Sequence, residues 1–266
     1  MLTIFTSPKP FIGKFNIIQR NAIQSWTLLN PKPEIILLDK VEGTETVAKD
    51  LGIQNSPDIS QFKKAQSSAK NDLVGYVNAD IILTDSIFTA IETVKKFVNN
   101  SKFLVVGKRW SIFLDRPFNF KKGDWQDDLK KFREYNDNGF MGHAGQIDYF
   151  IFPKNIEWNT PPFLMGKGAW NGWFIHNAIK MEIPVIDASG FITAYHQEHF
   201  NFDPADYNKK QTKKERRINK KLSGGFLNRY TILDSSHRLT FNGLKKSSFI
   251  RRFSSNFSKI KMLFVD

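Results

Sequence analysis

The residue in this sequence most suited to metal chemistry is Asp80. It follows the β-prone segment 72–77, whose residue types are those of a buried strand. Mg²⁺ and Mn²⁺ take hard oxygen ligands and keep positions open for the oxygens of a diphosphate, so a carboxylate at a strand end suits them. An acid in this position can also cap the next helix or a turn. The segment therefore predicts a metal ligand or a capping residue.

The first hundred residues alternate between strand-like and helix-like patterns. Short apolar runs lie at 2–5, 34–38 and 103–106, and apolar residues recur at helical spacing between them. This order predicts an α/β fold with a mostly parallel, doubly wound central sheet flanked by helices. Ligands bind such a sheet beyond the carboxyl ends of its strands. We expect polar residues from three strand ends to share that edge, namely Thr6, Ser7, Asp39, Asn78 and Asp80.

Later segments extend the pattern. Residues 145–153 and 184–187 have strand-like sequences, and a further short strand is expected at 194–199. Residues 111–140 are polar and irregular, and we expect them to form a long excursion over the sheet edge.

The order of these segments resembles GT-A-type nucleotide-sugar glycosyltransferases. Asn78-Ala79-Asp80 resembles their DxD motif, with Asn in place of the first Asp. Other segments similar to a bacterial, archaeal and plant branch of that fold lie at 3–8, 19–26, 145–153, 184–188, 195–199 and 231–237. The resemblance implies a GT-A (Rossmann-like) fold over residues 1–204. It also implies transfer of a sugar from a nucleotide-diphosphate donor, assisted by a divalent cation, Mn²⁺ or Mg²⁺.

The resemblance also implies roles for individual residues. Asp80 matches the position that binds the metal directly, whereas the amide of Asn78 can hydrogen-bond the ribose or a metal-bound water but supplies no charge. Arg20 can approach the phosphates or brace the fold. The implied donor-binding residues are Thr6, Ser7, Arg20, Asp39 and Asn78.

His196 and His199 are the candidates for the remaining metal ligands, because many GT-A enzymes use a late His or Asp and imidazole is acceptable to Mn²⁺. If segment 194–199 is extended throughout, these two side chains point to opposite faces. They could equally be a surface pair. His237 is a third option, three residues after Asp234.

An inverting transfer needs a carboxylate that takes the proton of the acceptor hydroxyl. Asp148 is the first candidate, because it is an acid within an otherwise apolar strand, where burial without a partner is costly. Asp187, at the end of the strand-like segment 184–187, is the second. Both can also be structural acids, and a retaining mechanism needs no such base.

Two tryptophans flank a polar pair and are candidates for acceptor binding. Trp170 and Trp173 can stack on the faces of sugar rings, and Asn171 can bond their hydroxyl groups. The alternative is a helix start whose tryptophans pack into the core. The expected acceptor is a polysaccharide or a lipid-linked glycan.

The C-terminal segment has its own composition. Residues 205–266 hold 16 of the 39 Lys and Arg residues but only 4 of the 26 Asp and Glu residues, so residues 1–204 are nearly neutral. We expect 205–266 to be a basic, amphipathic helical extension, with Phe residues between 249 and 264 at helical spacing. Such a helix can lie on an anionic membrane surface, and it can equally dock on its own catalytic domain or on a partner. We expect the protein to be cytoplasmic and peripheral at the inner face of the membrane.

Two rival functions remain open. A nucleotidyltransferase acting on sugar phosphates also uses strand-end carboxylates, but segment 6–11 lacks the glycines of its phosphate-binding loop. A non-enzymatic nucleic-acid-binding protein could use the basic tail, although its aromatic residues do not alternate with basic ones. The absence of Cys excludes disulfides and thiolate chemistry.

Overall fold

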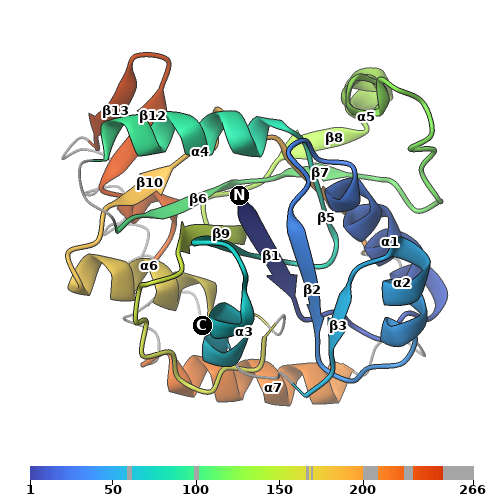
Figure 1. Ribbon diagram of the computed structural model, residues 1–266, viewed down its shortest axis with the longest axis horizontal. Helices are drawn as coiled ribbons and strands as arrows, with labels where there is room; N and C mark the ends of the chain where they lie inside the picture. The colour runs from blue at the N-terminus through green and yellow to red at the C-terminus, as the bar shows by residue number, and fades with distance from the viewer. Residues whose placement is uncertain are drawn as a thin grey trace.

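The computed structural model describes residues 1–58, 62–98, 102–165, 168, 170–199, 209–224 and 230–247. Within these residues the larger sheet has nine strands, in the order β13-β12-β10-β6-β9-β4-β1-β2-β3 (Figure 1). Their bounds are β1 Leu2–Thr6, β2 Glu34–Leu38, β3 Gln54–Ser56, β4 Leu73–Val77, β6 Leu104–Lys108, β9 Ile147–Pro153, β10 Val185–Asp187, β12 His237–Thr240 and β13 Gly243–Lys246.

Most neighbours in this sheet are parallel, which confirms the predicted fold class. β1 pairs in parallel with β2 and β4, β2 with β3, and β10 with β6 and β12. β9 is antiparallel to both β4 and β6, and β13 is antiparallel to β12. The carboxyl ends of β1, β2 and β4 therefore meet at one edge, as the positions of Thr6, Asp39 and Asn78 require.

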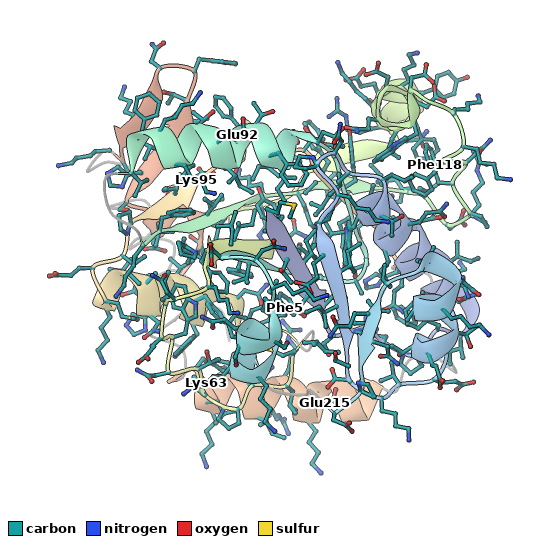
Figure 2. All side chains as sticks on the ribbon, viewed as in Figure 1. Phe5, Lys63, Glu92, Lys95, Phe118 and Glu215 are labelled. Atoms are coloured by element: carbon teal, nitrogen blue, oxygen red, sulfur yellow. The ribbon has the colours of Figure 1, made fainter. Side chains whose placement is uncertain are left out.

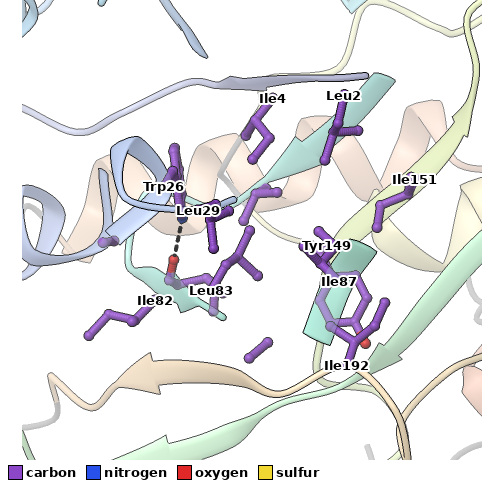
Figure 3. Close-up of a cluster of buried hydrophobic side chains, with 14 of the residues drawn as sticks. Leu2, Ile4, Trp26, Leu29, Ile82, Leu83, Ile87, Tyr149, Ile151 and Ile192 are labelled. Atoms are coloured by element: carbon purple, nitrogen blue, oxygen red, sulfur yellow. Dashed lines mark hydrogen bonds between the residues drawn. The ribbon is translucent and has the colours of Figure 1, made fainter. Parts of the chain in front are cut away.

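Helices cover both faces of the sheet. They are α1 Gly13–Thr27, α2 Thr44–Leu51, α3 Phe62–Ser68, α4 Ser86–Phe97, α5 Trp125–Glu134, α6 Asn171–Lys180 and α7 Lys209–Leu222. One core cluster holds buried residues of α1, α2, α4 and α5, and the other holds buried residues of α3 and α6. Figure 3 shows the first cluster, where the indole of Trp26 donates a hydrogen bond to the carbonyl of Ile81 (2.8 Å). Phe15, Ile18 and Ala22, which recur at helical spacing, lie on the buried side of α1.

A second, four-stranded sheet lies beside the first, in the order β5-β11-β7-β8. Its strands are β5 Ile81–Leu83, β7 Trp110–Ile112, β8 Gly139–Met141 and β11 Ala194–Gln197. β5 begins directly after Asp80, and β11 carries His196 opposite Ile81. The predicted excursion at 111–140 is thus partly ordered secondary structure, because it supplies β7, α5 and β8.

The C-terminal segment is only partly helical. Residues 209–222 form α7, but 237–246 form the β12–β13 hairpin, which extends the large sheet through β10. The prediction of a helical extension is therefore wrong for this hairpin. The Phe pattern at 249–264 lies outside the described residues. In the described parts of the chain, each helix is too short or too polar to cross a bilayer.

Candidate metal and donor site

Asp80, His196 and His199 come together in the structure. Each offers one ligand atom, and these three atoms lie within 4.8 Å of one another. Nε2 of His196 lies 3.5 Å from Oδ2 of Asp80, and Nε2 of His199 lies 3.6 Å from the same oxygen. The structure thus brings together the three residues that we expected to bind the metal.

Both histidines reach Asp80 because β11 ends at Gln197. His196 belongs to the strand and faces the start of β5, whereas His199 lies beyond the strand end, where two-residue alternation no longer applies. His237, the third option, is on β12 and contacts the hydroxyl of Ser236 (2.9 Å). It is not part of the cluster.

The donor set fits a divalent cation. One carboxylate and two imidazoles are ligands that Mn²⁺ accepts, and three protein ligands leave positions open for a substrate. Oδ1 of Asp80 is buried and has no hydrogen-bond partner among the described residues. A buried carboxylate oxygen without a partner is costly, so a ligand at this point would stabilise it.

The charges of the cluster are strongly coupled. Burial alone would raise the pKa of Asp80, but the charge of His196 and hydrogen bonds from both histidines outweigh it and hold that pKa well below its usual range. Burial would likewise lower the pKa of His196, yet the Asp80 carboxylate and the bond to Glu198 raise it to about 9. Without a metal, the cluster is therefore an ion pair of an aspartate and an imidazolium.

A chain of buried polar groups lies behind the cluster. Nδ1 of His196 is 3.1 Å from Oε1 of Glu198, and a guanidinium nitrogen of Arg109 is 3.8 Å from the same oxygen. Arg109 also forms a short ion pair with Oδ2 of Asp148, whose Oδ1 accepts a hydrogen bond from Asn78 (2.6 Å). Arg109 therefore connects a metal-ligand candidate with the first position of the Asn-Ala-Asp motif.

The backbone of Asp80 is held separately. The backbone N–H and the side-chain amide of Gln197 both donate to the carbonyl of Asp80, each at 3.3 Å. The amide of Gln197 also donates to Ile18 of α1 (2.7 Å) and accepts from Asn21 (2.9 Å). Gln197 is fully buried, so the strand end is fixed to α1 by a side chain inside the core.

Two adjoining cavities lie beside the cluster. The smaller, of about 60 Å³, is lined by Asp80, Asn78 and residues of the loop after β1. The larger, of about 580 Å³, is lined by Ser7, Asp39 and segment 160–165, with Lys63 of α3 and Glu215 of α7 (both labelled in Figure 2). Ser7, Pro8, Lys9 and Met165 line both cavities. A volume of this size suits a nucleotide-sized ligand.

Most of the expected donor residues lie at these cavities. The hydroxyl of Ser7 donates a short hydrogen bond to Asp39, which has a positive φ of 64° after β2. Thr6 is fully buried, and its hydroxyl has no partner among the described residues. Arg20 lies elsewhere, because it pairs with Asp50 (2.9 Å) on the surface and lines neither cavity.

The expected acceptor tryptophans are in the core. Trp170 and Trp173 are 1% and 9% exposed, and Trp170 packs edge-on against Tyr76 (4.8 Å). Asn171 donates to the carbonyl of Ile147 (2.5 Å). These three residues therefore fix the start of α6 against β4 and β9, and the two indole faces are not available to a sugar.

The two candidate bases are both engaged within the protein. Asp148 uses one oxygen for Asn78 and the other for Arg109. Oδ1 of Asp187 accepts from the N–H (2.9 Å) and the hydroxyl (2.5 Å) of Ser189. Neither carboxylate lines the two cavities.

Several residues of the site were not foreseen. The backbone of Lys9 is held on both sides by the buried amide of Gln19 (2.7 and 2.9 Å), and its ammonium lies 4.2 Å from the centre of the Phe15 ring. Pro8-Lys9-Pro10, a basic residue between two prolines after the first strand, was the available signal. Strand alternation places Glu198 on the face of His196, but Arg109 had no signal, because only long-range pairing brings it to Glu198.

Comparison with known proteins gives structural similarity alone. No family model matches this sequence, and no curated protein does. A crystal structure of a mycobacterial protein has a TM-score of 0.48 and 12% identity, covering 85% of this chain and 75% of that chain. Glucosyl-3-phosphoglycerate synthase from Mycobacterium tuberculosis, crystallised with Mn²⁺, UDP and glucosyl-3-phosphoglycerate, has a TM-score of 0.46 and 12% identity, covering 85% and 80%.

A third solved structure, S. aureus TarS 1-349 in complex with UDP, has a TM-score of 0.34 and 11% identity. It covers 46% of this chain, and this chain spans 39% of it. The function of the chain is therefore argued below from its own site residues.

Proposed function

We propose that this chain is a metal-dependent glycosyltransferase of the GT-A type that uses a nucleotide-diphosphate sugar as donor. The observation that supports this proposal most directly is the Asp80–His196–His199 cluster, since Asp80 lines a cavity that adjoins a nucleotide-sized one. A divalent cation bound there would neutralise the diphosphate charge that develops as the nucleotide leaves.

The residues of the larger cavity would bind the nucleoside. Asp39 and Ser7 offer acceptor and hydroxyl groups at the cavity wall, which suit the hydroxyls of a ribose. Lys9 lies where the two cavities adjoin, with its backbone fixed by Gln19. Its ammonium, over the ring of Phe15, would bind phosphate oxygens.

We assign Asp148 a positioning role. Its two oxygens hold Asn78 and Arg109, so it keeps the amide of Asn78 oriented toward the small cavity. Because both oxygens are engaged and the side chain lines neither cavity, Asp148 is not placed to take a proton from an acceptor hydroxyl. We likewise assign Asp187 a structural role, because it is buried, accepts two hydrogen bonds from Ser189 and lines neither cavity.

The proposal is tested by a thermal-shift screen of nucleoside diphosphates and nucleotide-sugars with and without Mn²⁺. A ligand that binds only the folded state at about 100 times its Kd stabilises it by about 2.7 kcal/mol. We expect one nucleotide class to raise the Tm only with Mn²⁺, and Asp80→Asn to abolish that shift. Equal shifts in wild type and Asp80→Asn would refute the metal role of this cluster.

We further propose that the acceptor is a polysaccharide or lipid-linked glycan and that the protein is cytoplasmic and peripheral at the inner membrane face. In support, α7 presents five exposed basic residues near the larger cavity, Lys213, Lys214, Arg216, Arg217 and Lys221. Basic residues near an anionic surface contribute about 1 kcal/mol each. Co-sedimentation with vesicles containing phosphatidylglycerol, but not with pure phosphatidylcholine, is expected. Binding to neither kind of vesicle would contradict the membrane proposal.

A further inference from the structure

The second sheet carries exposed aromatic side chains that the site described so far does not use. Phe113 and Phe140 are 52% and 44% exposed, and their ring centroids are 6.1 Å apart. Neither residue lines the two cavities. Single exposed phenylalanines need no explanation, but an adjacent pair beside a functional site calls for one.

The strand register places this pair relative to the metal ligands. In the four-stranded sheet, His196 is opposite Ser111, and Ser111 is opposite Phe140. Directly opposed residues on neighbouring strands have side chains on the same face. Phe140 therefore shares the face of His196, two strands away, at a backbone distance of about 10 Å.

Further contacts support this placement. Arg109, two residues before Ser111, reaches Glu198, whose side chain contacts His196, so β7 and β11 present one common face. Pairing continues beyond β7, because the N–H of Phe113 donates to the carbonyl of Asn138 (3.2 Å) and the N–H of Glu198 donates to Ile112 (2.8 Å). Phe113, two residues after Ser111, falls on the same face as His196.

We propose that Phe113 and Phe140 form the acceptor-binding platform, which takes a saccharide ring by stacking on its C–H face. The inference rests on the proposed glycosyl transfer, because an acceptor must approach the donor sugar near the metal ligands. The rings of Phe113 and Phe140 meet that requirement. They are flat, exposed on the same sheet face as His196, and close enough to it for a short oligosaccharide to span the gap. The platform replaces the one expected from Trp170 and Trp173, which are buried.

The test is saturation-transfer difference NMR with the methyl glycosides of glucose, galactose, mannose and N-acetylglucosamine, in the presence of Mg²⁺. We expect at least one to bind wild type and to bind Phe113→Ala and Phe140→Ala about fivefold more weakly or worse. Phe140→Tyr should retain binding because it keeps the ring, and Phe140→Leu should not. Phe241→Ala is the matched control, since Phe241 is 95% exposed on the distant β12–β13 hairpin.

The outcomes separate this inference from the proposed function. Nucleotide binding with Mn²⁺, measured by thermal shift on the same variants, should be unchanged in Phe113→Ala and Phe140→Ala. Equal saccharide signals in wild type and both Ala variants, or no signal from any of the four glycosides, would overturn the platform even if nucleotides bind. A wild-type dimer that dissociates in Phe113→Ala would also overturn it, because a second copy of the chain would then occupy this face.

Discussion

Replacing Arg109 with Met should destabilise the protein strongly. The side chains of Arg109, Asp148 and Glu198 are 11%, 8% and 3% exposed. Arg109→Met leaves the buried carboxylate of Asp148 without its cation, whereas Glu198 keeps its contact with His196 (3.1 Å). Removing one partner of a buried ion pair costs about 3–5 kcal/mol. For a chain of this size, that loss corresponds to a Tm lowered by about 6–20 °C.

The assay is guanidinium unfolding followed by tryptophan fluorescence, with EDTA present so that metal binding does not contribute. Arg20→Met is the matched control. It removes the same charge from the Arg20–Asp50 pair, whose side chains are 34% and 47% exposed. An exposed pair of this kind contributes below about 1 kcal/mol.

A double-mutant cycle with Asp148→Asn isolates the Arg109–Asp148 contact. The two substitutions should be less costly together than the sum of their separate effects, with a coupling of about 1–3 kcal/mol. A coupling below about 0.5 kcal/mol, or an Arg109→Met variant as stable as Arg20→Met, would refute the positioning role of this pair.

Three further predictions concern the same region. His199→Ala should weaken Mn²⁺ binding by at least about tenfold in isothermal titration, whereas His237→Ala should leave it unchanged, and equal effects would contradict the assigned ligands. Burial, with the nearby Asp187 and Asp148 carboxylates, raises the pKa of Tyr149 well above its usual 10. The unfolded chain then loses this proton first, so the free energy of unfolding should fall above pH 10, and no fall between pH 9 and 11 would count against it. Asn78→Asp should lower the Tm, and adding Asp148→Asn should recover only part of that loss, because it restores an amide–carboxylate contact but leaves Arg109 without its partner. A Tm unchanged in the single variant would show that the contact is not needed.

The central sheet could be predicted because its signal is local. Short apolar runs separated by helical patterns identify β1, β2 and β4, and the rule for parallel sheets places their ends together. The orientation of β9 and the existence of the second sheet depend on which distant strands pair. Nothing within segment 110–112 specifies that it will pair with β11, and nothing within 139–141 specifies that it will pair with 110–112, so the sequence pattern of 111–140 is irregular.

The candidate site, too, could be predicted in part: its residue types are a local signal, but their meeting in space is not. Asp80 and the two histidines could be named from residue type and order, but their meeting depended on β11 ending at Gln197. Aromatic residue type alone could not separate a stacking surface from a core position. Trp170 fits either, and only its contact with Tyr76 decides that it is buried.

The contact between Asn78 and Asp148 explains why position 78 is Asn and not the Asp of the DxD motif. Its amide nitrogen lies 2.6 Å from Oδ1 of Asp148, so a carboxylate at position 78 would place two negative charges in contact inside the protein. Asp148 in turn needs its charge for Arg109, which also compensates Glu198 behind His196. An amide at position 78 can therefore donate a hydrogen bond to Asp148. Its own carbonyl oxygen is buried, has no hydrogen-bond partner in the described residues, and could accept a hydrogen bond from a ligand. Asp80 is then the carboxylate of the metal-ligand candidates, and His196 and His199 would complete the set as imidazole ligands of a cation.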